Sequence, residues 1–503
     1  MWNSVSNKII SILGSKKFLC VIIAVLVLGA GWIAITASYP MAFDESFHLG
    51  IIQLYAHQVS PILTSVPASS AGQFGELTHD PSYLYHYLMS FPYRLIELLT
   101  KDFVTQVIIM RFINIALFAG GIVAFRKLLI RIGASSALTN FSLLMLVLLP
   151  VAPFLAAHIN YDNMLFLLLP INLWFVLGCV QSITNKSKVD ARDIILMLSL
   201  GALTSLVKYV YLPIFAASVI YVIVLWLWNK KRSAILHSVL VSFKSMKTVV
   251  KVGLIVALVI STGLFMQRYG VNIVMYHDVQ PDCAKVETVE NCLKYGPWAR
   301  NYGLEAAAQS ATTRPTPMAL PVFLVSWVNA LIYKLYFAIN YDFTEYAPMP
   351  LPFAMAYIVG IIGVFLVAFF WRSILKVNKH ILLFVTIIAA YALSLIYVNY
   401  TEYLRFDKIV AVNGRYFMPL LPFIFIIIGL ACRRLLAKFW PLNMNVVKGS
   451  LVVLATLVAL QGGGAMTYLI HSEPVWYWKN DPLTSFNTSS QKIITSLVIG
   501  AKK

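Results

Sequence analysis

Two adjacent carboxylates and a nearby histidine stand where they could carry out acid–base chemistry. Asp44 and Glu45 follow directly on an apolar run at 18–37, and His48 comes four residues after Asp44. A carboxylate within hydrogen-bond reach of a hydroxyl group can remove its proton as the oxygen attacks. If residues 44–57 form a short helix, His48 lies on the same face as Asp44 and can orient it or tune its pKa. The alternative is a solvated pair of charges without a chemical role.

The apolar run before these residues places them at a membrane surface. At 1.5 Å per helical residue, 18–37 is long enough to cross a hydrocarbon core of about 30 Å. Carboxylates are costly in hydrocarbon, so we expect Asp44 and Glu45 in water or in a protein-walled cavity at the interface.

The composition identifies a membrane protein. The chain of 503 residues is 60% hydrophobic and 12% charged, with a mean hydropathy of +0.79, whereas soluble domains have about 25% charged residues. The net charge of +19 is spread over short connections between apolar runs. Nucleic-acid binding would instead need a soluble basic module, and the sequence has none. We therefore expect membrane lipids, and no nucleic acid, as partners.

The apolar runs predict an all-α polytopic bundle of eleven transmembrane helices. After the first, they lie at 105–125, 137–157, 163–181, 194–207, 211–228, 249–266, 350–371, 380–399, 417–431 and 447–470. This gives one transmembrane domain over 1–470, with long loops at 39–102 and 267–349, and a tail at 471–503.

The distribution of charge predicts the orientation. With the N-terminus inside, every inner connection is basic, and Asp190 and Asp193 are the two carboxylates that fall there. This agrees with the positive-inside rule and puts the long loops and the C-terminus outside the cell membrane. Counting 320–339 as a twelfth span would move several later basic residues outside. We therefore expect 320–339 to be an interfacial helix with three aromatic side chains at headgroup level, Trp327, Tyr333 and Tyr336.

Two cysteines lie in a loop assigned to the outer side. Cys283 and Cys292 are separated by eight residues, and an oxidising compartment would let them form a disulfide. Two free thiols are the alternative. The remaining three, Cys20, Cys179 and Cys432, lie in or beside apolar runs and are expected to be small core residues.

Further polar residues are expected on the same side as Asp44. They are His79, Asp80, Asp162, Glu402, Arg405, Asp407, Lys408 and Arg415. Within the predicted spans, Arg111 is the one charged residue away from the inner ends, where Lys251 and Lys448 lie. Ion-coupled transporters usually carry ionisable groups near the midplane, so this pattern favours chemistry at the outer face.

Four short motifs resemble those of the GT-C superfamily of membrane glycosyltransferases. The acidic pair Asp44-Glu45 lies where that superfamily has its acidic motif. Residues 79–87 (HDPSYLYHY) resemble the stretch that closes the same loop, with Ser82 where a second proline is usual. Residues 160–162 (NYD) resemble an Asn-Pro-Asp turn, with tyrosine in place of proline. Residues 414–422 (GRYFMPLLP) resemble the entry to a late helix in a bacterial branch.

The resemblance implies a GT-C-like bundle that moves a sugar from a polyprenyl-phosphate donor to an extracytoplasmic acceptor, which could be an envelope glycan, a lipid or a protein. Related enzymes include protein mannosyltransferases and aminoarabinose transferases. We expect an inverting reaction in which Asp44 is the base, aided by Glu45 and His48. The leaving phosphate needs positive charge more than a proton.

Candidate donor-binding residues are those that could hold the phosphate or the sugar. Arg415 is the leading cation because its planar fork can hold two oxygens, and Arg405, Lys408 and Lys208 support it. The other candidates are His79, Asp80, Tyr83, Tyr85 and Asp162. The tyrosines could instead form an interfacial aromatic belt.

Other mechanisms and functions stay open. We expect no cofactor, but Asp44, Glu45, Asp80 and Asp162 could together hold a divalent cation that bridges the phosphate. The chain could also be a lipid or solute transporter, or a non-catalytic scaffold for envelope assembly.

Overall fold

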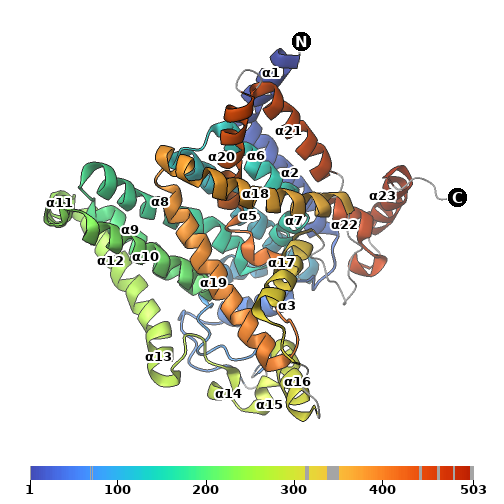
Figure 1. Cartoon of the computed structure of the whole chain (residues 1–503). Coiled ribbons are helices and arrows are strands. Elements are labelled where there is room, and N and C mark those ends of the chain that lie inside the picture. The colour runs from blue at the N-terminus through green and yellow to red at the C-terminus, as the bar shows by residue number, and fades with distance from the viewer. Residues whose placement is uncertain are drawn as a thin grey trace.

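The computed structural model describes residues 2–67, 70, 72–311, 316–336, 350–440, 444–460, 465–479 and 482–498. Within these residues the chain is built of helices, and pairing between extended segments is limited to isolated bridges. Figure 1 shows long helices that form a bundle, with short helices gathered near one end. The expected all-α class is confirmed.

Seven helices in the described residues are long and apolar enough to cross a membrane. They are α2 (Lys16–Thr36), α5 (Phe103–Ile132), α8 (Tyr161–Lys186), η2 with α10 (Tyr209–Tyr211, Leu212–Trp228), α12 continuing through η3 into α13 (Thr248–Phe265, Met266–Gly270, Val271–Tyr276), α18 (Pro350–Val377) and α19 (Ile381–Phe406). The chain is therefore a polytopic membrane protein.

The other four predicted spans fall on shorter helices or on two consecutive helices. These are α6 with α7 (Ser136–Leu148, Val151–Ala156), α9 (Ala191–Val207), α20 (Leu421–Phe439) and α21 with α22 (Met444–Leu460, Ala465–His471). The span at 137–157 is broken because Pro150 disfavours helical geometry at Leu149, whose ψ is 131°. Helix α9 has 17 residues, the lower end of a spanning length.

Short helices lie near the end of the bundle that carries Asp44. They are α3 (Glu45–Ala56), α4 (Leu84–Leu99), α14 (Cys283–Val286), α15 (Val289–Cys292), α16 (Gly296–Ser310), α17 (Leu320–Tyr336) and η4 (Gly414–Phe417). The remaining helices are α1 (Trp2–Gly14), α11 (Arg232–Ser245), η5 (Pro474–Trp476) and α23 (Pro482–Val498).

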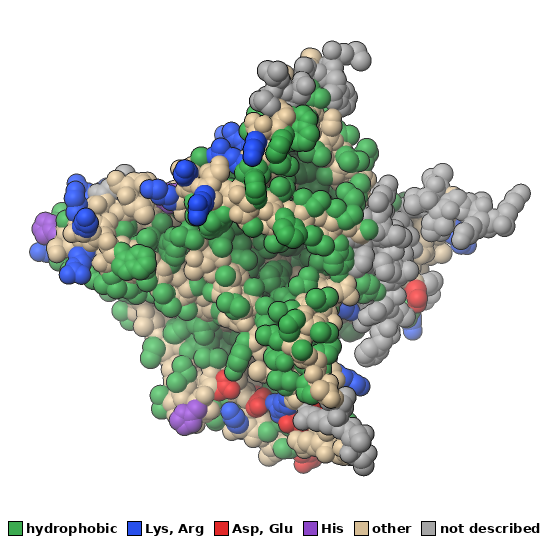
Figure 2. Space-filling model, viewed as in Figure 1, with side chains coloured by type: hydrophobic (Ala, Val, Ile, Leu, Met, Phe, Trp, Pro, Cys, Tyr) green, Lys and Arg blue, Asp and Glu red, His purple; other side chains and the backbone are tan. Residues whose placement is uncertain are grey.

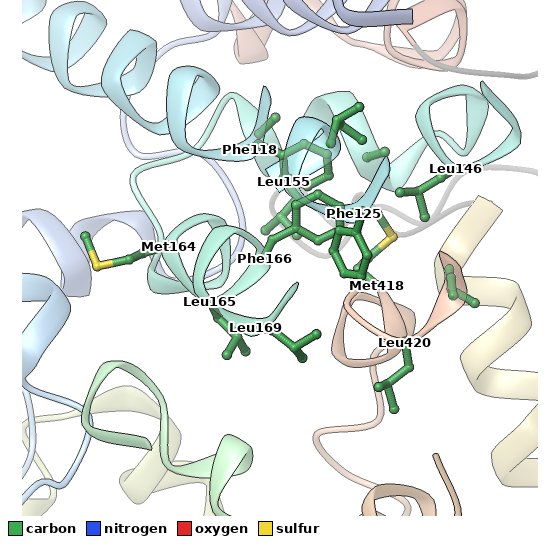
Figure 3. Close-up of a cluster of buried hydrophobic side chains, with 14 of the residues drawn as sticks. Phe118, Phe125, Leu146, Leu155, Met164, Leu165, Phe166, Leu169, Met418 and Leu420 are labelled. Carbon is green, nitrogen blue, oxygen red and sulfur yellow. The ribbon is translucent and has the colours of Figure 1, made fainter. Parts of the chain in front are cut away.

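Aromatic packing between α5 and α8 forms the centre of the bundle (Figure 3). The rings of Phe118 and Phe166 stack with centroids 4.1 Å apart, and Phe125 packs beside them at 4.8 Å from Phe166. All three side chains are buried. Gly121 makes this possible, because a Cβ there would lie 2.4 Å from the Phe166 ring. This packing fixes the start of α8, which carries Asp162.

The two ends of the bundle differ in charge (Figure 2). In this view Lys and Arg side chains gather at the upper edge and around α11 at the left, whereas most Asp and Glu side chains lie along the lower edge near α14 to α16. Apolar side chains cover the surface between them. This is the pattern that the sequence predicted from its basic connections.

Two predictions about the 267–349 loop have different outcomes. The disulfide is confirmed, since Cys283 and Cys292 are joined. Trp327, which we expected at headgroup level, is covered by protein. Its side chain is buried and its Nε1 donates to Asn399 Oδ1 at 2.9 Å, because α17 packs on α19. Residues 337–339 of the proposed interfacial helix lie outside the described residues.

Candidate functional site

Asp44 begins α3 in an uncommon backbone conformation. Both Phe43 and Asp44 have φ of 61°, in the left-handed region, where non-glycine residues are strained and often functional. The Asn160 side chain donates from Nδ2 to the Phe43 carbonyl at 2.9 Å and holds the turn in place. The Asp44 side chain stays 49% exposed, so it is available to a ligand.

Glu45 turns inward and pairs with Arg111. Nε and Nη2 of Arg111 donate to Oε1 and Oε2 of Glu45, each at 2.8 Å, and both side chains are fully buried. Arg111 also donates to the carbonyls of Ala34, Ala37 and Ser38 at the end of α2. Burial alone would raise the pKa of Glu45, but Arg111 holds that pKa below its usual value. The pair therefore anchors the beginning of α3 to α2 and α5.

Four charged side chains of alternating sign lie beside one another. Lys208 Nζ is 2.5 Å from Asp162 Oδ1, Asp162 Oδ2 is 3.8 Å from Arg415 Nε, and Arg415 Nη2 donates to Asp44 Oδ2 at 3.2 Å. Lys208, Asp162 and Arg415 are buried. They come from the start of α8, the end of α9 and η4, so three separate parts of the chain converge on Asp44.

Arg415 retains hydrogen-bonding capacity. Within the described residues, its Nε and Nη1 are buried and donate no hydrogen bond. Its guanidinium lies over the Phe43 ring, 4.5 Å from the centroid. Buried donors without a partner are costly, so they are well suited to an anionic ligand. Lys208 adds a second cation, between the rings of Tyr161 and Tyr416, at 4.4 and 4.9 Å.

The motif at 414–417 owes its glycine to close packing. A Cβ at Gly414 would lie 2.6 Å from the Leu331 carbonyl oxygen of α17. The Asn413 side chain accepts from the Arg415 backbone N–H at 3.0 Å and begins η4. This turn directs Arg415 inward.

His48 bonds a second histidine rather than the Asp44 carboxylate. Its Nδ1 is 2.9 Å from His86 Nε2, and the two rings stack. Burial lowers the pKa of His86 to about 3 and holds that of His48 well below its usual value. Both rings are therefore neutral at pH 7. His48 supports Asp44 through the backbone, where its N–H donates to the Asp44 carbonyl at 3.0 Å.

A cavity of about 1070 Å³ opens beside Asp44 and Arg415. It extends from the ring of Tyr161 to α16 and α19, a volume at the upper end for small-molecule sites. The predicted residues that line it are Asp44, His48, His79, Asp80, Arg405 and Arg415. Asp162 and Lys208 lie behind Arg415 and Tyr416 in the second layer of the wall.

Other predicted residues are placed differently. Tyr83 and Tyr85 do not line the cavity: Tyr83 packs under Arg268, and Tyr85 donates to Asn114 Oδ1 at 2.9 Å. Lys408 is exposed and lies outside the lining. Arg405 is at the rim, 44% exposed and paired with Glu305 at 2.6 Å.

His79 and Asp80 form part of the far wall. His79 Nδ1 is 3.0 Å from Asn272 Oδ1, and Asp80 accepts from the Ser82 backbone N–H at 2.9 Å. Burial raises the pKa of Asp80 to about 6. The two residues are therefore fixed to neighbouring chain segments.

The four carboxylates considered for a metal site are not assembled into one set. Glu45 is paired with Arg111, and Asp162 lies between Lys208 and Arg415. Across the described ranges, no three His, Cys, Asp or Glu side chains are close enough together to hold a metal ion.

Sequence reasoning missed three residues that position the site. Arg111 was noted as a charged residue within a predicted span. A buried arginine needs a carboxylate partner, so this signal could have indicated Glu45. Asn160 was noted as part of the 160–162 motif, but not as a partner of Phe43. Phe43 gave no local signal, because its contacts to Asn160 and to Arg415 depend on tertiary packing.

We expect anion binding at this site to weaken in mild alkali. Burial lowers the pKa of Lys208 to about 8, with Asp162 opposing the effect. Above that pH Lys208 loses its charge, so affinity for a phosphate ligand should fall, by up to about tenfold per pH unit. Phosphate-ester binding measured between pH 7 and 9.5 tests this. In Lys208→Arg the charge persists and the fall should disappear; a fall that persists in that variant would assign it to another group.

Comparison with known families gives one match. The family model described as "Predicted membrane protein (DUF2142)" matches residues 68–424, which is more than two thirds of the chain and includes Asp80, Asp162, Lys208 and Arg415. A search of curated proteins returns no match. By this match the chain belongs to the DUF2142 family of predicted membrane proteins.

Proposed function

We propose that this protein is a glycosyltransferase that moves a sugar from a polyprenyl-phosphate donor to an acceptor hydroxyl. The observation that carries the proposal is the half-exposed Asp44 carboxylate beside Arg415, whose Nε and Nη1 are buried without hydrogen-bond partners in the described residues. A base and an anion site thus lie at one end of a cavity of about 1070 Å³. The motif resemblance to the GT-C superfamily supports the same assignment.

The proposed orientation puts this cavity on the extracytoplasmic side of the cell membrane. The basic connections then lie inside, together with the N-terminus, and the disulfide lies in an oxidising compartment. The C-terminus is outside.

In the proposed reaction the donor phosphate binds Arg415 and the charge of Lys208. The acceptor oxygen attacks the anomeric carbon, Asp44 takes the hydroxyl proton, and the bond from that carbon to the phosphate oxygen breaks. The electron pair leaves with the polyprenyl phosphate, whose charge the two cations stabilise. In this reaction Glu45 does not accept the hydroxyl proton. Its pairing with Arg111 fixes the beginning of α3 and so positions Asp44.

Purified protein supplied with a panel of polyprenyl-phosphate sugars tests the proposal by release of the lipid phosphate. Sugar-dependent release that requires an acceptor supports it. Accumulation of unchanged substrate inside proteoliposomes would instead favour a transporter. No release and no transport with any donor, together with unchanged envelope assembly after Asp44 substitution, would favour a scaffold.

Arg415 should determine donor affinity. Replacement with Lys keeps the charge but loses the planar fork, so donor affinity should fall by about ten- to a hundredfold, the equivalent of one charged hydrogen bond. Equilibrium binding of a non-hydrolysable donor analogue measures this. Arg405→Lys at the exposed rim is the matched control and should stay near the parent value. Unchanged affinity in Arg415→Lys would place the phosphate elsewhere.

A further inference from the structure

A second cavity, of about 420 Å³, adjoins the first at Asp44. Its walls come from α3, from the turn at 72–75 and from the start of α16. Asp44, Phe47 and Tyr295 line both cavities. The rings of Phe47 and Tyr295 stack with centroids 5.3 Å apart. The boundary between the cavities therefore carries this aromatic pair and the proposed base.

The two cavities differ in charge. Among the described residues that line the second cavity, Asp44 is the single residue with an ionisable acidic or basic side chain of the Asp, Glu, Lys, Arg and His types. The first is lined by Arg415, Arg405, Arg300 and Lys334, as well as by several carboxylates. A phosphate would find its cations in the first cavity, so the second is suited to a neutral molecule.

Gln53 lines the second cavity, and its side-chain amide is held by hydrogen bonds. Its Nε2 donates to Tyr93 Oη at 2.9 Å, and Tyr93 in turn donates to Gln106 Oε1 at 3.3 Å. Gln106 Nε2 donates to the Thr100 carbonyl at 2.8 Å. This chain of donors fixes the Gln53 amide. Its Oε1, which has no hydrogen-bond partner in the described residues, can therefore accept from a ligand hydroxyl.

Gln73 also lines the second cavity and lies on a closely packed turn. Gly75 N–H donates to the Gly72 carbonyl at 3.1 Å. Gly72 has φ of 79°, and a Cβ there would lie 2.1 Å from the Asn291 carbonyl oxygen. The turn therefore packs directly against α15, next to the Cys283–Cys292 disulfide. This packing holds the exposed Gln73 side chain at the cavity.

We propose that the second cavity binds the acceptor, and that the acceptor is a neutral saccharide. Amide groups pair with sugar hydroxyls, and the Phe47–Tyr295 pair at the boundary offers an aromatic surface for a sugar ring. The volume of about 420 Å³ suits a small ligand or the end of a glycan chain. The inference rests on the proposed function, because it uses Asp44 as the base that meets the acceptor hydroxyl at the boundary.

Protection of an engineered cysteine tests this without any turnover. In Gln73→Cys, made in a Cys20→Ser background because Cys20 is exposed, the thiol should react readily with a neutral methanethiosulfonate reagent. Neutral methyl hexosides should slow the reaction about tenfold at ten times their dissociation constant. Methyl glucuronide and a Ser/Thr-containing peptide should not slow it.

Val59→Cys in the same background is the matched control. Val59 is in the same loop, is 88% exposed and lines neither cavity, so saccharides should leave its rate unchanged. After modification of Gln73→Cys, donor-analogue binding should be retained while acceptor-dependent release of lipid phosphate falls at least about tenfold.

Protection by the peptide or the glucuronide, or equal effects at positions 73 and 59, would overturn the saccharide inference. Unchanged acceptor use after modification would also overturn it. Failure of the proposed function would be seen separately, as absence of release by the parent protein with every donor. Saccharide protection is measured without donor and is unaffected by that result.

Discussion

Asp44→Asn should remove most sugar transfer while the protein still folds and inserts. Asn has nearly the shape of Asp and also tolerates the left-handed conformation at position 44, but it does not accept a proton at neutral pH. Loss of a general base typically costs about 10² to 10⁴ in rate, or roughly 3 to 5 kcal/mol of barrier. Turnover per folded molecule, measured with a polyprenyl-phosphate sugar, gives the comparison.

Donor binding provides the internal control for Asp44→Asn. Arg415 would lose the negative charge of its partner at 3.2 Å, so donor-analogue affinity should stay the same or increase. Turnover at the parent rate would refute the role of Asp44 as the base. Activity that follows added divalent metal, with Asp44→Asn and Glu45→Gln equally inactive, would favour the metal-dependent alternative.

Breaking the Glu45–Arg111 pair should have the largest effect on stability. Both side chains are fully buried, and removing one partner leaves an uncompensated charge, so Glu45→Gln or Arg111→Leu should each cost about 3 to 5 kcal/mol of unfolding free energy. Denaturant titration in detergent measures the loss. The contribution should be present above about pH 4.5 and be lost as pH falls through the lowered pKa of Glu45.

The exposed pair Arg405–Glu305 is the matched control for Glu45–Arg111. Its arginine is 44% exposed, so Glu305→Gln should change stability by less than about 1 kcal/mol. A Glu45→Gln variant that is as stable as the parent but inactive would mean that Glu45 takes part in the chemistry and does not position Asp44.

The difference between Asp44 and Glu45 could not be predicted from their order in the chain. Both follow the same apolar run, and both were candidates for catalysis. In the structure the left-handed turn at Phe43 and Asp44 leaves Asp44 half exposed and buries Glu45 against Arg111. The Asn160 contact that holds this turn comes from a helix more than a hundred residues later.

Tertiary packing also distinguishes the four candidate cations from one another. Arg415 was the leading candidate for its planar fork, and Arg405, Lys408 and Lys208 were supporting candidates, each near a helix end. Arg415 and Lys208 meet at Asp162, whereas Arg405 pairs at the rim and Lys408 lies outside the cavity. Local sequence gives the end of the bundle on which a residue lies, but not which side of its helix faces the cavity.

The sequence by itself determined the membrane class, the positions of the long apolar helices, the disulfide and the gathering of Asp44, Asp162 and Arg415 at one end. Apolar length, charge asymmetry and cysteine placement are properties of neighbouring residues, so they can be determined from one chain. Tertiary structure alone decided three other features. These are the alternating cluster of Lys208, Asp162, Arg415 and Asp44, the burial of Glu45 and Tyr85, and the two cavities that meet at Asp44. Each depends on contacts between helices far apart in the chain, and helix–helix packing selects these contacts by shape and hydrogen-bond satisfaction.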